Sequence, residues 1–135
     1  MGKVLIIDDE REIVELLKFV LEKEGHEVVF AYEGNVGIEK AKEECPDLII
    51  LDVMMPGADG YTVHLKLSQD ESTKDIPILI LTAKGQMRDL FAMSKNIVAY
   101  IEKPFDPKIL RAKVNEIIAK RQALKKREGV GYGCY

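Results

Sequence analysis

The sequence predicts an α/β protein built on an open parallel sheet, and three observations lead to this class. The chain has 135 residues, which fits one domain of the usual size of about 100–200 residues. Hydrophobic residues make up 47% and charged residues 32%, an ordinary composition for a folded domain. Five short apolar runs alternate with segments of helical periodicity. This alternation predicts parallel strands with right-handed crossovers, and there are too few units to close a (β/α)8 barrel, so we expect the doubly wound form.

Each expected strand is a short apolar run bounded by turn residues. The first run, KVLII, is continuously aliphatic and stops at an acidic pair, as strands buried on both faces of a parallel sheet do. By the same criterion we assign strands to Lys3–Ile7, Glu27–Ala31, 48–51, 76–81 and 97–101.

The segments between the strands carry apolar residues at helical spacing. Ile13, Leu17 and Leu21 lie on one face of the first helix, which Gly25 ends. Four further helices are expected at Gly34–Glu44, 61–67, 85–94 and from 107 to beyond 119. A single histidine, His64, falls on the third helix, where we expect it to be exposed to solvent.

Charge is unevenly distributed along the chain. The formal net charge is −3, yet the segment 108–128 carries +6, so the rest carries −9. Basic residues suit the C-terminal end of a helix and a solvated face, so nucleic acid is not expected as a partner. We expect a domain over residues 1–120, followed at 121–135 by a basic helical extension and a loose glycine-rich tail.

The N-terminus predicts neither export nor a membrane span. Its apolar run ends at Asp8 and is too short for a signal-peptide core. Ile6 stands where a myristoylation signal requires Ser or Thr. We therefore expect a cytoplasmic protein with no membrane partner.

Polar side chains follow four of the five expected strands. Asp8, Asp9 and Glu10 follow the first strand, Asp52 the third, Thr82 the fourth and Lys103 the fifth. The carboxyl ends of parallel strands meet at one edge of a sheet, where sites form. Two carboxylates about 4 Å apart repel by roughly 4 kcal/mol at an effective dielectric of about 20, so such a group protonates or recruits a cation.

The cation that suits these ligands is Mg²⁺, which prefers hard oxygen ligands and often shares its site with phosphate oxygens. The Lys103 ammonium and the Thr82 hydroxyl are suited to phosphoryl oxygens. Taken singly, each residue has a simpler interpretation: helix cap, turn residue, strand threonine or surface lysine. Their occurrence together, each after a separate strand, favours a site.

Four motifs in this order give the chain a family resemblance. They are LIIDDE at 5–10, LDVMMPG at 51–57, LTA at 81–83 and IEKPF at 101–105. Over nearly its whole length the chain resembles the receiver domain of two-component response regulators. The resemblance implies a flavodoxin-like fold with five parallel strands in the order 2-1-3-4-5 and five helices. It also implies a cis peptide bond between Lys103 and Pro104.

The resemblance assigns roles to the residues at the sheet edge. Asp52 would accept a phosphoryl group and become 4-aspartylphosphate. Asp9, Asp52 and the backbone carbonyl of Met54 would bind Mg²⁺ directly, with Asp8 acting largely through water. The remaining roles concern the phosphoryl group and the switch: Lys103 as phosphate contact, Thr82 as switch hydroxyl and Tyr100 as aromatic switch.

The partners that the resemblance implies are proteins. A sensor histidine kinase or phosphotransfer protein would donate the phosphoryl group, and an unknown downstream protein would receive the signal, with phosphorylation-dependent dimerisation as one form of output. The chain would be a signalling domain rather than an enzyme. The stretch 94–100, which leads from the fourth helix into the fifth strand, is one residue shorter than in most relatives, which affects the expected output face.

Two other functions remain open from the residues. A Mg²⁺-dependent phosphohydrolase with an aspartyl intermediate would commonly carry its nucleophile in an Asp-x-Asp motif after the first strand. This chain instead has an isolated aspartate, Asp52, after the third strand. A degenerate receiver that only binds partners would be expected to lack part of the set that is complete here: Asp8, Asp9, Asp52, Thr82 and Lys103.

Overall fold

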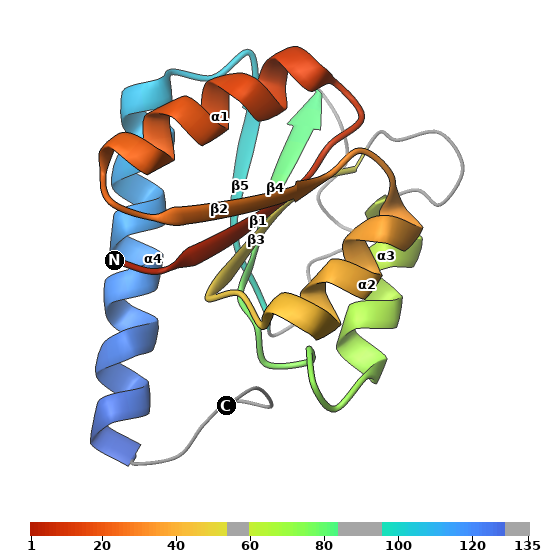
Figure 1. Ribbon diagram of the computed structural model, residues 1–135, viewed down its shortest axis with the longest axis vertical. Coiled ribbons are helices and arrows are strands. Elements are labelled where there is room, and N and C mark those ends of the chain that lie inside the picture. Colours follow the sequence, from red (N-terminus) through yellow and green to blue (C-terminus); the bar gives the residue numbers. More distant parts are fainter. Residues whose placement is uncertain (54–59, 84–95, 129–135) are drawn as a thin grey trace.

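The computed structural model describes residues 1–53, 60–83 and 96–128, which form one five-stranded parallel sheet (Figure 1). The strand order is β2-β1-β3-β4-β5, so the predicted fold class and order are confirmed. The elements are β1 (Lys3–Ile7), α1 (Arg11–Lys23), β2 (Glu27–Ala31), α2 (Gly34–Glu44), β3 (Leu48–Asp52), α3 (Gly60–Gln69), β4 (Ile78–Ala83), β5 (Ile97–Lys103) and α4 (Pro107–Glu128).

Some sequence expectations fall outside the described residues. These are the helix expected at 85–94, the Met54 carbonyl, the glycine-rich tail and part of the shortened connection at 94–100. Among the described residues there are four helices, at positions where four of the five were expected.

Helices cover both faces of the sheet. α1 and α4 lie on one face, and α2 and α3 lie on the other (Figure 1). Alternate residues of each strand point to opposite faces, so Ile6 packs in the α1/α4 core and Ile7 in the α2/α3 core. Burial on both faces explains why the central strands are apolar without interruption.

One glycine brings α3 close to the end of β3. A Cβ atom on Gly60 would lie 2.4 Å from the Cα of Val53 and 2.9 Å from the Asp52 carbonyl oxygen. The Gly60 amide also donates a hydrogen bond to the Val53 carbonyl at 3.3 Å. The missing side chain therefore lets the first turn of α3 pack directly against the residue that follows Asp52.

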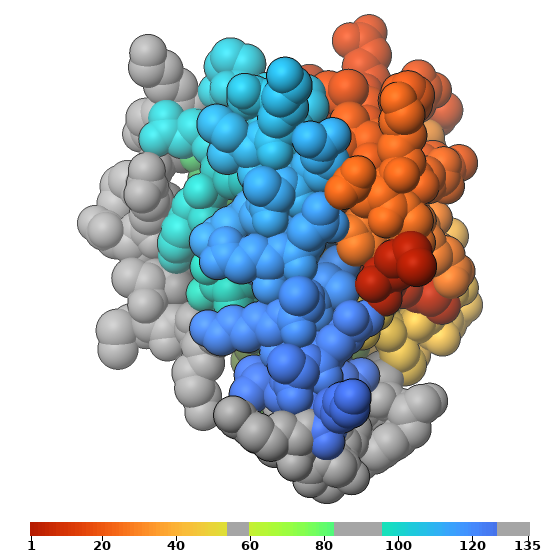
Figure 2. All heavy atoms as spheres, turned by 90° about the vertical axis from the view of Figure 1, so that its left-hand side faces the viewer, coloured from red at the N-terminus to blue at the C-terminus, as the bar shows by residue number. Residues whose placement is uncertain are grey.

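α4 runs the height of the molecule beside α1 and β5, with the N-terminal residues next to it (Figure 2). Its inner face buries Leu110, Val114, Ile117 and Ile118, the residues that the periodicity predicts. Beyond them Arg121 is only 7% exposed, and its Nη1 donates to the Asp75 carbonyl at 2.9 Å. The helix is thus attached to the body of the domain at its far end as well.

A polar chain joins α4 to the N-terminus and to the end of α1. His26 is buried, and its Nδ1 accepts the Gly2 amide at 3.1 Å. Nε2 therefore carries the proton and donates to Asn115 Oδ1 at 2.6 Å. Asn115 Nδ2 in turn donates to Glu24 Oε1 at 2.9 Å. Two neutral side chains thus link three separate segments of the chain.

Within the described residues, no helix combines the length and the apolar character that crossing a membrane requires.

Candidate functional site

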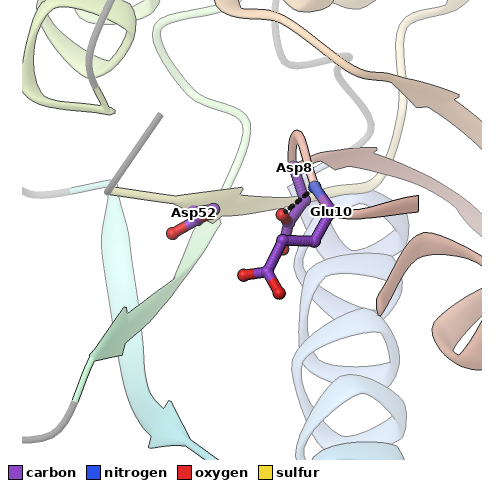
Figure 3. A group of neighbouring side chains, drawn as sticks. All are labelled: Asp8, Glu10 and Asp52. Atoms are coloured by element: carbon purple, nitrogen blue, oxygen red, sulfur yellow. Dashed lines mark hydrogen bonds between the residues drawn. The ribbon is translucent and has the colours of Figure 1, made fainter. Parts of the chain in front are cut away.

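Three acidic side chains meet at the carboxyl edge of the sheet. Asp8 follows β1 and Asp52 ends β3; because these strands are neighbours in parallel register, their ends lie next to each other. Glu10, which precedes α1, joins them (Figure 3). One carboxylate oxygen from each residue lies within 4.8 Å of the others. Asp8 is fully buried and Asp52 is 2% exposed, so two of the three charges lie in the protein interior.

The backbone fixes the orientation of Asp8. Its Oδ1 accepts the Glu10 amide at 2.9 Å, and its own amide donates to the Ala31 carbonyl at 3.1 Å. Burial raises the pKa of Asp8 from its ordinary value of 3.8 to about 6; the Glu10 amide opposes this shift, and the Asp52 charge adds to it. The Glu10 amide thus holds Asp8 Oδ1, while Asp8 Oδ2 points to the cation of the site.

That cation is the ammonium of Lys103, the last residue of β5. Its Nζ lies 2.9 Å from Glu10 Oε1, 3.2 Å from Asp8 Oδ2 and 3.3 Å from Asp52 Oδ2. Burial would lower the pKa of Lys103, but the Glu10 hydrogen bond and the Asp52 and Asp8 charges prevail and raise it. Lys103 therefore stays charged. The peptide bond to Pro104 is cis, as the resemblance implies.

The charge balance of this group fits a divalent cation. Three ionised carboxylates and one ammonium leave a formal charge of −2, in a place where two of the carboxylates are excluded from water. Carboxylate oxygens in an incomplete shell are the donor set that Mg²⁺ uses beside phosphate. The cluster of Asp8, Glu10 and Asp52 can therefore hold a metal ion.

The structure does not place every predicted metal ligand in this cluster. Asp9 is exposed and is not one of its three members, and Met54 lies outside the described residues. Glu10, which the sequence places with the acidic residues after the first strand but to which no role was assigned, is one of them.

Thr82 and Tyr100 lie on one face of the sheet. Thr82 is buried near the end of β4, one residue beyond Leu81, the register partner of Asp52. Tyr100 pairs with Ile80, two residues before Thr82, and packs against the α2/α3 core. Because side chains two apart on a strand share a face, the hydroxyl and the ring belong to the same surface of the sheet.

One expectation about a histidine was wrong. His64 was expected to be exposed, but it is 2% exposed on the inner side of α3, and burial lowers its pKa. Its position beside Val63 and Leu67 makes it a core histidine.

The family model for the response regulator receiver domain matches residues 4–115. The chain belongs to this family. This receiver domain is similar to the DNA-binding dual master transcriptional regulator RpaA of Synechocystis sp., with 41% identity over 119 residues. The match covers 87% of this chain and 49% of RpaA. The chain thus spans about half the length of that relative.

Two further matches cover nearly the whole length of both proteins compared. Protein PilH of Pseudomonas aeruginosa is 34% identical over 120 residues, covering 88% of this chain and 99% of PilH. The crystal structure of a response regulator receiver domain protein from Clostridium thermocellum superposes with a TM-score of 0.81 at 30% identity, covering 92% of this chain and 99% of that one. The receiver assignment thus rests on sequence and fold together.

Proposed function

We propose that this receiver domain accepts a phosphoryl group on Asp52 from the phosphohistidine of a sensor histidine kinase or phosphotransfer protein. One observation carries the proposal: the buried Asp52 carboxylate lies 3.3 Å from the Lys103 ammonium and beside a second buried carboxylate, Asp8. A nucleophilic carboxylate, a fixed cation and a place for a divalent ion are the parts that phosphoryl transfer to an aspartate needs.

The step itself is a simple displacement. A carboxylate oxygen of Asp52 attacks phosphorus, the P–N bond of the donor phosphohistidine breaks, and the imidazole leaves with the electron pair of that bond. Lys103 neutralises charge on the phosphoryl oxygens, and its raised pKa keeps it protonated for that role. The transition state needs positioning and charge neutralisation more than proton transfer, and Lys103 supplies such charge neutralisation.

A bound Mg²⁺ would neutralise further charge on the phosphoryl oxygens. Asp8, Asp52 and Glu10 support such a site through their grouped oxygens, and the resemblance adds Asp9 and the Met54 carbonyl.

The signal would leave through Thr82 and Tyr100. A phosphoryl group on Asp52 offers new acceptor oxygens next to the strand that carries Thr82. A shift of the Thr82 hydroxyl towards them changes the space on the face that Tyr100 shares. Phosphorylation of Asp52 would in this way change the conformation of a surface to which a downstream protein or a second copy of the chain binds.

We further propose that residues 1–120 form the signalling unit, that 121–135 form an extension, and that the protein acts in the cytoplasm. RpaA, of which the chain covers half, is a DNA-binding transcriptional regulator, whereas PilH matches over nearly its full length.

The test is incubation with acetyl phosphate and Mg²⁺, followed by intact mass and phosphate release. We expect one phosphoryl group per chain at a hydroxylamine-sensitive bond, and none in Asp52→Asn. Sustained phosphate release at high turnover would instead identify a phosphohydrolase. A wild-type chain that takes no label, from acetyl phosphate or from a phosphorylated kinase, would identify a binding-only receiver.

A further inference from the structure

Glu10 directs its carboxylate into the site instead of capping its own helix. It occupies the N-cap position of α1, with extended backbone angles of φ −87° and ψ 106°, but its side chain makes no capping hydrogen bond. N-cap residues ordinarily use a short side chain to accept a free amide of the first turn. Glu10 Oε1 instead lies 2.9 Å from Lys103 Nζ, the shortest of the three carboxylate contacts of that ammonium.

The ammonium has as many donors as it has acidic neighbours. A lysine carries three N–H donors, and within the described residues Lys103 has three carboxylate partners. Lys103 donates hydrogen bonds to Asp8 and Glu10 and forms an ion pair with Asp52, so a phosphoryl oxygen competes with these partners for its N–H donors.

The three partners are not equally free to leave. The side chain of Asp8 is 0% exposed and held by the Glu10 amide, and Asp52 would itself carry the phosphoryl group. The side chain of Glu10 is 58% exposed. It can turn into water with little loss of solvation, so Glu10 is the partner that releases Lys103.

We propose that Glu10 is a positioning residue that holds Lys103 in the unphosphorylated state and competes with the phosphoryl group for it. The inference rests on the proposed function, because it assigns Lys103 to the phosphoryl oxygens. It predicts that removing the Glu10 charge has opposite effects on Mg²⁺ binding and on binding of the phosphoryl group. Removing the Glu10 charge weakens Mg²⁺ binding, because the site loses a negative charge. The same change frees Lys103 and lessens repulsion of an anionic donor.

The experiment compares Glu10→Gln with a matched control, Glu12→Gln. Glu12 lies in the first turn of the same helix, is exposed, and within the described part of the chain makes no ion pair with Lys103. Both variants remove one negative charge from an exposed glutamate of α1 or its cap. Circular dichroism verifies that both are folded.

Two measurements are made at saturating Mg²⁺: the rate of phosphorylation by acetyl phosphate and the affinity for beryllofluoride, an anionic phosphoryl mimic. For Glu10→Gln we expect both to increase about two- to fivefold, the factor for losing one partly exposed ion pair. Calorimetric Mg²⁺ affinity should fall by a similar factor. Glu12→Gln should behave like the wild type in all three.

Other outcomes overturn the inference. Unchanged beryllofluoride affinity in Glu10→Gln would show that Glu10 does not restrain Lys103. Weaker beryllofluoride binding or slower labelling at saturating Mg²⁺ would show that Glu10 assists the site directly. If the wild type takes no label, the proposed function fails, and the beryllofluoride comparison still decides the role of Glu10.

Discussion

Lys103 Nζ lies 3.3 Å from Asp52 Oδ2, although β4 separates the strands on which the two residues stand. The contact is possible because the lysine side chain is long enough to cross the end of a neighbouring strand. It links the expected phosphoacceptor to the edge strand of the sheet, and it explains why the site depends on residues more than fifty positions apart in the sequence.

We expect Asp52→Asn to leave the metal-free fold at least as stable as the wild type. The change removes one of three crowded carboxylates and with it their mutual repulsion, while Asp8 and Glu10 still pair with Lys103. Urea denaturation without Mg²⁺ measures this. A loss of stability in Asp52→Asn would show that the buried Asp52–Lys103 pair is a net stabilising contact.

Asp9→Ala should weaken Mg²⁺ binding about tenfold or more, since loss of even an outer-shell partner commonly costs about 10–100-fold in metal affinity. Asp9 is exposed and outside the acidic cluster, so metal binding would have to turn its side chain inwards. Calorimetric titration gives the affinity, with Glu12→Gln as the control for general charge. Equal affinities for Asp9→Ala and wild type would remove Asp9 from the ligand set.

The stability of the metal-free protein should fall as pH rises from about 4 to about 6. The pKa of Asp8 is raised from 3.8 to about 6 in the folded state, so in this window the folded chain binds more protons than the unfolded chain. The loss should be at most about 3 kcal/mol, at about 1.4 kcal/mol per pH unit. Denaturation of wild type and Asp8→Asn across this range tests it, because Asp8→Asn should lack the slope.

Mg²⁺ affinity should change with pH in the opposite direction. A carboxylate must lose its proton before it can bind a metal, so affinity should rise as pH rises towards and past about 6. Titrations at several pH values measure this directly. A flat profile would show that Asp8 does not contribute to the metal site.

Gly60→Ala should destabilise the domain by about 1–3 kcal/mol. The new Cβ would meet the Val53 backbone at 2.4 Å, so either α3 or the end of β3 has to shift. Thermal denaturation compares it with Lys66→Ala, an exposed position on the same helix. We expect slower phosphorylation as well, because Val53 follows Asp52; an unchanged rate would show that the displacement stays within α3.

Asn115→Ala should cost about 1–2 kcal/mol of stability and leave phosphorylation unchanged. The change removes the acceptor of His26 Nε2 and the donor to Glu24. Asn115→Asp restores an acceptor for His26 but places a negative charge near Glu24, so it should recover only part of the loss. A change in labelling rate for either variant would connect this polar chain to the acidic edge.

The apolar centres of the strands could be predicted from sequence, but the residues at which the fourth and fifth strands end could not. The fourth and fifth strands were expected to end at 81 and 101; they continue to Ala83 and Lys103, which pair with each other. In sequence, a polar residue after an apolar run looks like a loop residue. It belongs to the strand only because its backbone pairs with the neighbouring strand.

The contact of Glu10 with Lys103 shows a second limit. The two residues are 93 positions apart, and no periodicity or local motif links them. His64 shows a third: a lone polar residue on an amphipathic helix gives no indication of which side it faces until the helix packs. The meeting of Asp8, Asp52 and Lys103 at one edge of the sheet could be expected from sequence, because each stands at or just after the end of an apolar run.

The hydrogen bond from Arg121 fixes α4 at a point far from its first turn. The helix begins four residues after Lys103, and Arg121 is held at the Asp75 carbonyl near the opposite end of the sheet. From Pro107 to Arg121 the axis is about 21 Å long at about 1.5 Å per residue. A rigid tilt about that fixed point moves the first turn by about 0.4 Å per degree. A rotation of the helix about Arg121 would therefore displace its first turn, which begins four residues after Lys103, more than any other part of 107–121.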